Sequence, residues 1–288
     1  MTHRRNRLIA AGVGAALALS LAVPGVASAT AGGPVYVALG DSSAAGPLIP
    51  LQNDVACLRS DHNWPRVVAA ALGATIKDVT CSGAKVADLP GRQFGIVAPQ
   101  YDAVTTDADL VTIAIGANDL DLGVVVPTCA NPLPEPAGIS CKARLTAGGT
   151  DPLAAKIDAL APRIGAALVE IHRRAPHARV VVVGYGTYWK PGGCWPADPI
   201  WGRDADYLQA TFDRLMTMLA NQAAAHDAGY ADIRTPSADH GVCAPVGQRW
   251  MEGLVPTAAA APYHPNGTGM QHAGAVVAAA AGSSSGRD

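Results

Sequence analysis

The chain has 288 residues, 49% of them hydrophobic, and carries 21 Lys and Arg against 23 Asp and Glu. This length is enough to bury the core of one well-packed domain. The slight acidic excess argues against nucleic acid as a partner, because phosphate recognition needs a surplus of basic side chains.

The N-terminal segment predicts a secretory signal peptide over residues 1–29. A head with three arginines (1–7) precedes an apolar run (8–23) and a small-residue A-S-A sequence that ends at Ala29, the usual place of cleavage. The alternative is an uncleaved membrane anchor, but the run is short for a spanning helix. Cleavage after Ala29 leaves 18 basic and 23 acidic residues. We therefore expect an acidic, secreted protein with no stable membrane anchor and no nucleic-acid partner.

Apolar runs rich in β-branched residues alternate with helical patterns along the rest of the chain. We expect strands at 35–39, 76–80, 110–115, 179–184 and 230–234, and helices at 151–174, 204–228 and 266–281. Uninterrupted apolar runs are typical of parallel strands covered on both faces. The alternation predicts an α/β fold, a three-layer α/β/α sandwich with a central parallel sheet. This single domain should span residues 30–282, before a disordered tail at 283–288.

Two local features add detail to this plan. Pro162 falls inside the pattern of the helix at 151–174 and predicts a kink or a break there. Six cysteines follow the leader, and an even number in an exported chain predicts three disulfides, which six residues can form in 15 pairings. The chain has no Cys-x-x-Cys or His-x-x-x-His pair. We therefore expect no metal site.

Four short motifs carry the chemistry. Three follow strand ends, where open parallel sheets bind their ligands: "LGDSSAAG" contains Ser42, "CSGAKVADL" contains Gly83 and "IGANDL" contains Asn118. The fourth, "YHPNGTG", places His264 before the last helix. A serine hydroxyl beside an imidazole is a nucleophile with its base. A side-chain amide and a glycine N–H can donate hydrogen bonds to a developing oxyanion.

The four motifs, in this order, resemble the SGNH (GDSL) hydrolase family from Val35 to Ala281. The resemblance implies a flavodoxin-like SGNH hydrolase fold and hydrolysis of carboxylic esters through an acyl-serine intermediate, with no cofactor. It implies that Ser42 is the nucleophile and His264 the general base. The oxyanion hole would be formed by Gly83, Asn118 and the N–H of Ser42.

The cysteines and the leader suggest the secreted, disulfide-containing esterases and lipases of actinobacteria. That resemblance implies sequential pairing of the six cysteines, as Cys57–Cys81, Cys129–Cys141 and Cys194–Cys243.

The chain departs from the family pattern at Ala261, where the family has an aspartate three residues before the histidine. Three interpretations remain open. The main-chain carbonyl of Ala261 or of a neighbour orients His264, a distant acid such as Asp239 or Asp119 folds in, or the enzyme is impaired. We favour the carbonyl and hence a Ser–His dyad, because a carbonyl can fix the imidazole tautomer. His240, beside Asp239, is the rival base.

The sequence thus predicts a monomeric esterase or lipase acting on a small-molecule, lipid or acylated-glycan ester. The alternatives are an acyltransferase or thioesterase using the same serine, or a catalytically weak surface or carbohydrate-binding protein on the same fold. The aromatic loop at 185–203 forms either an apolar wall of the site or a small core of its own, with Tyr188, Trp189, Trp195 and Trp201.

Overall fold

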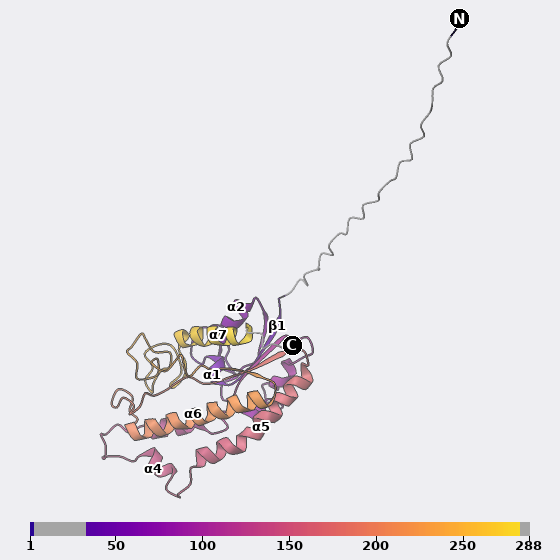
Figure 1. Ribbon diagram of the computed structural model, residues 1–288. Helices are drawn as coiled ribbons and strands as arrows, with labels where there is room; N and C mark the ends of the chain where they lie inside the picture. The colour runs from indigo at the N-terminus through magenta and orange to yellow at the C-terminus, as the bar shows by residue number, and fades with distance from the viewer. Residues whose placement is uncertain (3–32, 283–288) are drawn as a thin grey trace. The chain divides into compact units, whose positions relative to one another are not determined.

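A five-stranded parallel sheet lies at the centre of the computed structural model, which describes residues 1–2 and 33–282 (Figure 1). Its strand order is β4-β1-β5-β6-β7. The strands are β1 (Val35–Gly40), β4 (Thr75–Asp78), β5 (Leu110–Ala114), β6 (Arg179–Val183) and β7 (Gly229–Ala231). The predicted parallel pairing is confirmed, and β1 and β5 lie side by side in register from Tyr36 with Leu110 to Gly40 with Ala114.

Long helices cover both faces of the sheet (Figure 1). Side chains alternate along β1: Tyr36 and Ala38 pack in one buried cluster, whereas Val37 and Leu39 pack in another. The first cluster includes residues of α2 (Trp64–Leu72) and α7 (Gly267–Gly282), and the second includes residues of α5 (Pro152–Arg174) and α6 (Gly202–Ala225). The predicted α/β/α sandwich is therefore confirmed, and both faces of the sheet are apolar because both are buried.

The prediction of a break at Pro162 is wrong, because α5 is one helix from Pro152 to Arg174. Pro162 has no N–H to donate to the carbonyl of Asp158, four residues before it. Both residues are exposed. Water can therefore satisfy the freed carbonyl, while the buried stripe of α5 keeps the helix on the sheet. Asp151 caps the start of α5 by accepting from the N–H of Leu153 at 2.9 Å.

The loops between these elements contain short helices and a small ribbon. The helices are α1 (Ser42–Ala45), α3 (Leu122–Val125) and α4 (Cys141–Leu145), with single turns at Val86–Asp88, Gln100–Ala103 and Pro127–Cys129; β2 (Gln52–Asp54) and β3 (Arg59–Ser60) pair antiparallel. Three disulfides hold these loops, in the sequential pairing that the resemblance implies: Cys57–Cys81, Cys129–Cys141 and Cys194–Cys243.

The predicted signal peptide, apart from its first two residues, and the predicted tail at 283–288 lie outside the described residues. Within the described part of the chain, no helix combines the length and the apolar character needed to cross a membrane.

Candidate functional site

Ser42 lies at the sharp turn where β1 gives way to α1. Gly40 has a φ of 154°, and a Cβ there would come within 2.7 Å of the carbonyl oxygen of Ala114. The N–H of Asp41 donates to that same carbonyl at 2.9 Å. Only glycine fits this close approach, which fixes the turn against β5 and brings Ser42 to the carboxyl edge of the sheet.

Asp41 is buried and binds the turn rather than the imidazole. Its Oδ1 accepts from the N–H of Ser43 at 2.8 Å and from the Ser43 hydroxyl at 2.7 Å. Its Oδ2 accepts from the hydroxyl of Tyr185 at 2.7 Å, and the Tyr185 oxygen accepts from the N–H of Ala117 at 3.0 Å. These bonds join the ends of β1, β5 and β6. Burial raises the pKa of Asp41 to about 6, although the hydrogen bonds from Tyr185 and Ser43 act against it.

His264 binds the hydroxyl of Ser42 with one ring nitrogen and a main-chain carbonyl with the other. Nε2 lies 2.7 Å from Ser42 Oγ, and Nδ1 lies 2.8 Å from the carbonyl oxygen of Pro262. Because a carbonyl can only accept, Nδ1 carries the proton and Nε2 is free to accept from Ser42. Burial lowers the pKa of His264, and the bond to Pro262 acts in the opposite direction.

Of the interpretations left open, the structure has a main-chain carbonyl next to the ring, and it belongs to Pro262, the neighbour of Ala261, and not to Ala261 itself. The carbonyl of Ala261 accepts from the main-chain N–H of His264 at 3.2 Å, whereas Nδ1 of the ring lies 2.8 Å from the carbonyl of Pro262. The distant acids have other positions. Asp119 accepts from the N–H of Val86 at 3.0 Å and pairs with Arg163, and Asp239 lines a separate pocket.

The two further predicted donors lie on the segments that follow β4 and β5. Gly83 has a φ of 82°, which favours glycine, and comes two residues after the Cys57–Cys81 disulfide. Asn118 lines the same cleft as Ser42, and its Nδ2 donates to the carbonyl of Ala84 at 3.0 Å. This bond ties Asn118 to the residue after Gly83, and Nδ2 keeps a second N–H.

An apolar cleft opens beside the pair of Ser42 and His264 and encloses about 550 Å³, with open solvent at its mouth included. Asn118 adds the polar side-chain amide, while the remaining wall is mostly apolar and aromatic, from Leu122, Val126, Pro127, Tyr188, Phe212 and Tyr263. A cleft with one polar end and apolar walls suits an ester whose acyl or alcohol part is apolar.

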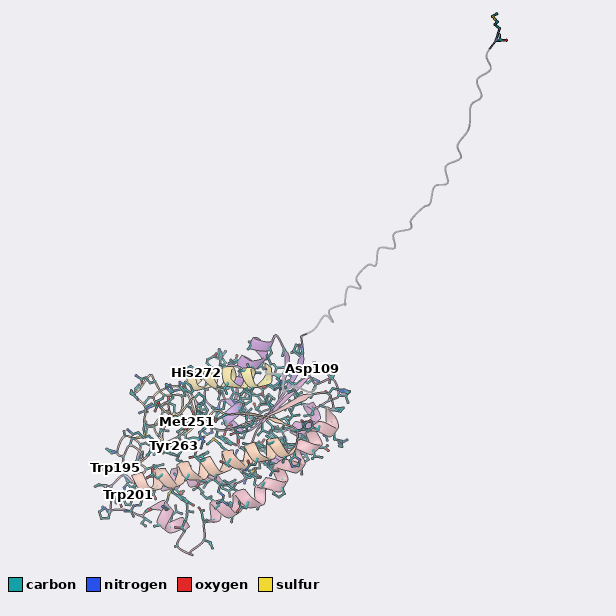
Figure 2. All side chains as sticks on the ribbon, in the orientation of Figure 1. Asp109, Trp195, Trp201, Met251, Tyr263 and His272 are labelled. Carbon is teal, nitrogen blue, oxygen red and sulfur yellow. A yellow bond between two sulfur atoms is a disulfide. The ribbon has the colours of Figure 1, made fainter. Side chains whose placement is uncertain are left out.

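Part of the aromatic loop at 185–203 forms a wall of the cleft, and part packs the loops as a small core, so each of the two interpretations applies to some of its residues. Tyr188 lines the cleft and stacks on Phe212 with ring centroids 4.2 Å apart. Trp189 is buried and donates to Asp198 at 2.8 Å. Trp195 and Trp201 donate to the carbonyls of Asn131 and Leu133, in the loop between α3 and α4, and neither lines the cleft. Figure 2 labels both side chains, which pack the loops.

The rival base His240 lies outside the cleft lining. Its ring stacks on Trp250 at 4.2 Å, and Trp250 stacks on His272 at 4.0 Å. Nδ1 of His240 lies 2.7 Å from the carbonyl of Gln248. His240 therefore packs the loop, and His264 alone of these histidines contacts the serine.

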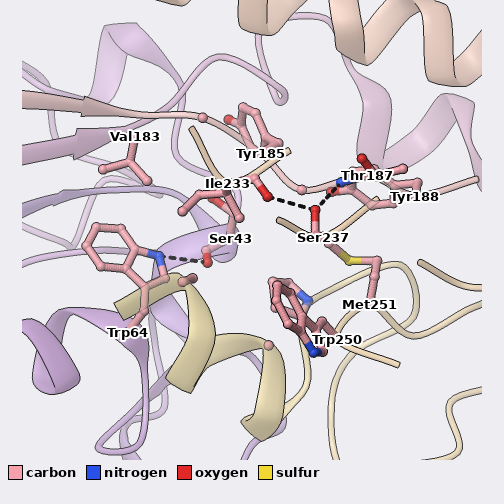
Figure 3. A pocket seen from close by; sticks show the side chains of 15 residues that line it. Ser43, Trp64, Val183, Tyr185, Thr187, Tyr188, Ile233, Ser237, Trp250 and Met251 are labelled. Carbon is pink, nitrogen blue, oxygen red and sulfur yellow. Dashed lines mark hydrogen bonds between the residues drawn. The ribbon is translucent and has the colours of Figure 1, made fainter. Parts of the chain in front are cut away.

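A second pocket lies behind the nucleophile turn and shares Ser43, Tyr185 and Tyr188 with the cleft (Figure 3). Its polar groups already bind one another: Trp64 donates to the carbonyl of Ser43 at 3.1 Å, and Ser237 accepts from the N–H of Thr187 at 2.8 Å (Figure 3). Without a free nucleophile or base, this pocket offers no catalytic chemistry. Among the described residues, no group of three or more His, Cys, Asp or Glu side chains could bind a metal ion.

The sequence analysis assigned no role to three residues near the site. Tyr185 follows β6 after Gly184, so its place at the carboxyl edge of the sheet was a usable signal. Gln100 gave no such signal in the sequence. Its buried side-chain amide binds both main-chain groups of Gly40: Oε1 accepts from the N–H at 2.8 Å, and Nε2 donates to the carbonyl at 3.0 Å. Phe94 is 66% exposed, and its ring lies 3.8 Å from where a Cβ on Gly83 would be.

Comparison with known proteins finds similar sequences and similar folds. The model of the GDSL-like lipase/acylhydrolase family matches residues 38–272. Lipase 2 of Streptomyces coelicolor is 37% identical over 243 residues, 81% of each chain. The crystal structure of phospholipase A1 from Streptomyces albidoflavus NA297 superposes with a TM-score of 0.72 at 27% identity, covering 86% of this chain and 100% of that one. The extracellular lipase of Streptomyces rimosus gives 0.72 at 28%, covering 86% and 99%.

Proposed function

Because the chain belongs to the GDSL-like lipase/acylhydrolase family and is a carboxylic ester hydrolase, we propose that it works through an acyl-serine intermediate on a Ser42–His264 dyad. The observation that carries this proposal is the relay from Ser42 Oγ to Nε2 at 2.7 Å and from Nδ1 to the Pro262 carbonyl at 2.8 Å. It supplies a nucleophile, a base in the right tautomer and an acceptor that fixes that tautomer.

The first half of the reaction acylates the enzyme. Nε2 of His264 takes the hydroxyl proton as Ser42 Oγ bonds to the ester carbonyl carbon, and the carbonyl oxygen becomes an oxyanion. The N–H groups of Ser42 and Gly83 and the amide of Asn118 stabilise this charge. Collapse breaks the carbon–oxygen bond of the ester, and Nε2 returns the proton to the leaving alcohol.

The second half releases the acid. Water loses a proton to Nε2 as its oxygen attacks the acyl-enzyme, and collapse frees the carboxylic acid and restores the hydroxyl of Ser42. In both halves the imidazole becomes a cation beside a neutral carbonyl. That carbonyl fixes the tautomer but provides less charge stabilisation than a carboxylate would.

The cleft supports an ester with an apolar part as substrate. Its aromatic and aliphatic wall can bury alkyl or aryl groups of the acyl chain or the alcohol. Relatives named lipase and phospholipase A1 are consistent with a lipid-like ester.

Secretion is part of the same proposal. The leader ending at Ala29 and the three disulfides both suit an oxidising, extracellular location. N-terminal sequencing of the protein from culture medium should begin at Thr30.

The test compares the wild type with Ser42→Ala on p-nitrophenyl esters from acetate to palmitate. We expect hydrolysis by the wild type and a loss of at least 10³-fold in Ser42→Ala, with unchanged far-UV circular dichroism. A fluorophosphonate should label the wild type on the peptide that contains Ser42 and leave Ser42→Ala unlabelled. Equal activity of the two proteins, or an adduct on another serine, would reject the assignment.

A further inference from the structure

A carboxylate is buried directly behind the histidine loop. Glu252 is 0% exposed. Its segment runs antiparallel to the segment after Tyr263, through an isolated bridge between Met251 and Pro265. The N–H of Glu252 donates to the carbonyl of His264 at 3.0 Å, so the main chain of Glu252 binds the catalytic residue itself.

The side chain of Glu252 connects the two ends of this loop, residues 257–266. Oε2 accepts from the N–H of Thr257 at 2.7 Å and from its hydroxyl at 2.9 Å, while Oε1 accepts from Nδ2 of Asn266 at 2.7 Å. Asn266 also donates to the carbonyl of Arg249 at 2.8 Å and accepts from the N–H of Gly269 at 3.0 Å, in the first turn of α7.

No salt bridge neutralises Glu252 among residues 33–282. Burying a carboxylate without a cation is unfavourable unless hydrogen bonds replace the lost water. Burial acts to raise the pKa of Glu252, but the bonds from Thr257 and Asn266 leave it below its ordinary value. The side chain is therefore an ionised acceptor whose bonds all go to the loop that carries His264.

The loop needs such restraint because its backbone is strained beside the base. Tyr263 has a φ of 58°, in the left-handed region that bulky residues avoid. A second buried carboxylate holds this residue: Oδ1 of Asp198 accepts from the Tyr263 hydroxyl at 3.1 Å and from the N–H of Leu254 at 3.2 Å. The conformation that turns the Pro262 carbonyl toward the ring thus depends on contacts outside the loop.

We propose that Glu252 is a positioning residue for His264: by tying Thr257 to Asn266, its carboxylate fixes the loop that presents the Pro262 carbonyl to Nδ1. The carboxylate of Glu252 then fixes the main chain on either side of His264 and does not contact the imidazole. A main-chain carbonyl can orient the ring only if the loop that carries it is held in place. A displacement of the catalytic group by about 1 Å can lower the rate 10²-fold. The inference rests on the proposed Ser42–His264 dyad.

Glu252→Gln is the sharpest test, because the amide keeps the shape and replaces one acceptor by a donor. In one orientation, the new NH₂ faces the N–H and hydroxyl of Thr257; in the other, it faces the NH₂ of Asn266. The Asn266 amide cannot flip to accept from it without losing its hydrogen bonds to the Arg249 carbonyl and the Gly269 N–H. We expect kcat for p-nitrophenyl butyrate to fall about 10- to 100-fold with KM within about twofold. Labelling of Ser42 by a fluorophosphonate should slow by a similar factor.

Asp204→Asn is the matched control. Asp204 is also 0% exposed, and its Oδ1 accepts from the hydroxyl of Ser140 at 2.6 Å and the N–H of Lys142 at 2.9 Å, at the start of α4. It does not contact the histidine loop through these bonds. Its Oδ2 has no hydrogen-bond partner, so an asparagine can place its NH₂ there and keep both bonds of Oδ1. Asp204→Asn should therefore leave kcat within about twofold.

Thr257→Val covers the case in which Glu252→Gln does not fold. Thr257 is exposed, so the variant should fold while losing one of the three bonds to Glu252, and kcat should fall about two- to fivefold. Wild-type kcat in every folded variant, or equal losses of kcat in Glu252→Gln and Asp204→Asn, would overturn the inference. Loss of activity in Ser42→Ala would still uphold the dyad, so the two failures are distinguishable.

Discussion

Nδ1 of His264 lies 2.8 Å from the carbonyl oxygen of Pro262, two residues before it in the chain. The site therefore contains no carboxylate on the imidazole, and the orienting group belongs to the same loop as the base. The position where the family has an aspartate, Ala261, instead uses its main chain to bind Pro47 and His264.

Ala261→Asp should therefore not improve the enzyme. Nδ1 already has its acceptor, so we expect kcat/KM for p-nitrophenyl esters to stay within about tenfold of the wild type. Ala259→Asp, at an exposed position of the same alanine run, controls for the added charge. A gain of 100-fold or more at Ala261 alone would show that the carbonyl is a poor substitute for the acid.

The pH–rate profile should show an acid limb below the ordinary pKa of histidine. Only neutral His264 can accept the proton of Ser42, so activity is lost as pH falls through its pKa, which burial lowers from 6.5. We expect the midpoint of kcat/KM below pH 6.5. Enzyme held at each pH and assayed at pH 8 should recover its activity, which separates titration from unfolding. A midpoint above pH 7 would indicate an anionic partner on the ring.

The order of elements and the edge that carries the site could be predicted, because both depend on local patterns. The apolar runs indicate β1, β5 and β6 to within one residue at each end. The edge strands β4 and β7 each begin one residue before the predicted starts at 76 and 230 and end before the predicted ends at 80 and 234. Each has one neighbouring strand, and its pairing stops before its apolar residues do.

The partners of the site residues depend on tertiary contacts that no local pattern contains. Tyr185 meets Asp41 across 144 residues, because β5 brings the ends of β1 and β6 together. The Pro262 carbonyl faces the ring because Tyr263 adopts a positive φ, which nothing in "APYH" indicates since tyrosine disfavours that region. The sequence therefore indicated a main-chain carbonyl near Ala261 as the orienting group, but neither the choice of Pro262 nor the bond of Tyr185 to Asp41.

Asp41→Asn should change the pH dependence of stability. The pKa of Asp41 is about 6 in the folded protein against 3.8 ordinarily, so the folded state binds more protons between these values. Stability from this group is therefore lost as pH rises from about 4 to 6, by about 3 kcal/mol in all. Asparagine does not titrate. In urea unfolding from pH 3.5 to 7.5, the free energy of unfolding of the variant should rise relative to that of the wild type by about this amount.

Tyr185→Phe is the companion measurement. It removes a hydrogen bond that lowers the pKa of Asp41, so the loss of stability with rising pH should extend to higher pH than in the wild type. A constant difference between Asp41→Asn and the wild type across the whole range would contradict a raised pKa at Asp41.

Phe94 should contribute to binding of large substrates. The ring is exposed beside Gly83, and the loop behind it is anchored by Gln93, whose Nε2 donates to the carbonyl of Ser82 at 2.8 Å. Phe94→Ala removes apolar surface next to the proposed oxyanion hole. We expect kcat/KM to fall about tenfold for p-nitrophenyl palmitate, equivalent to about 1.4 kcal/mol, and less than twofold for the acetate.

Ile96→Ala is the matched control, because Ile96 is 72% exposed on the same loop and should leave the ratio of the two esters unchanged. An equal loss on acetate and palmitate in Phe94→Ala would mean that the ring supports the loop around Gly83. A loss that grows with chain length means that the ring contacts the substrate, since only the longer acyl chain can reach beyond the glycine to an aromatic surface there.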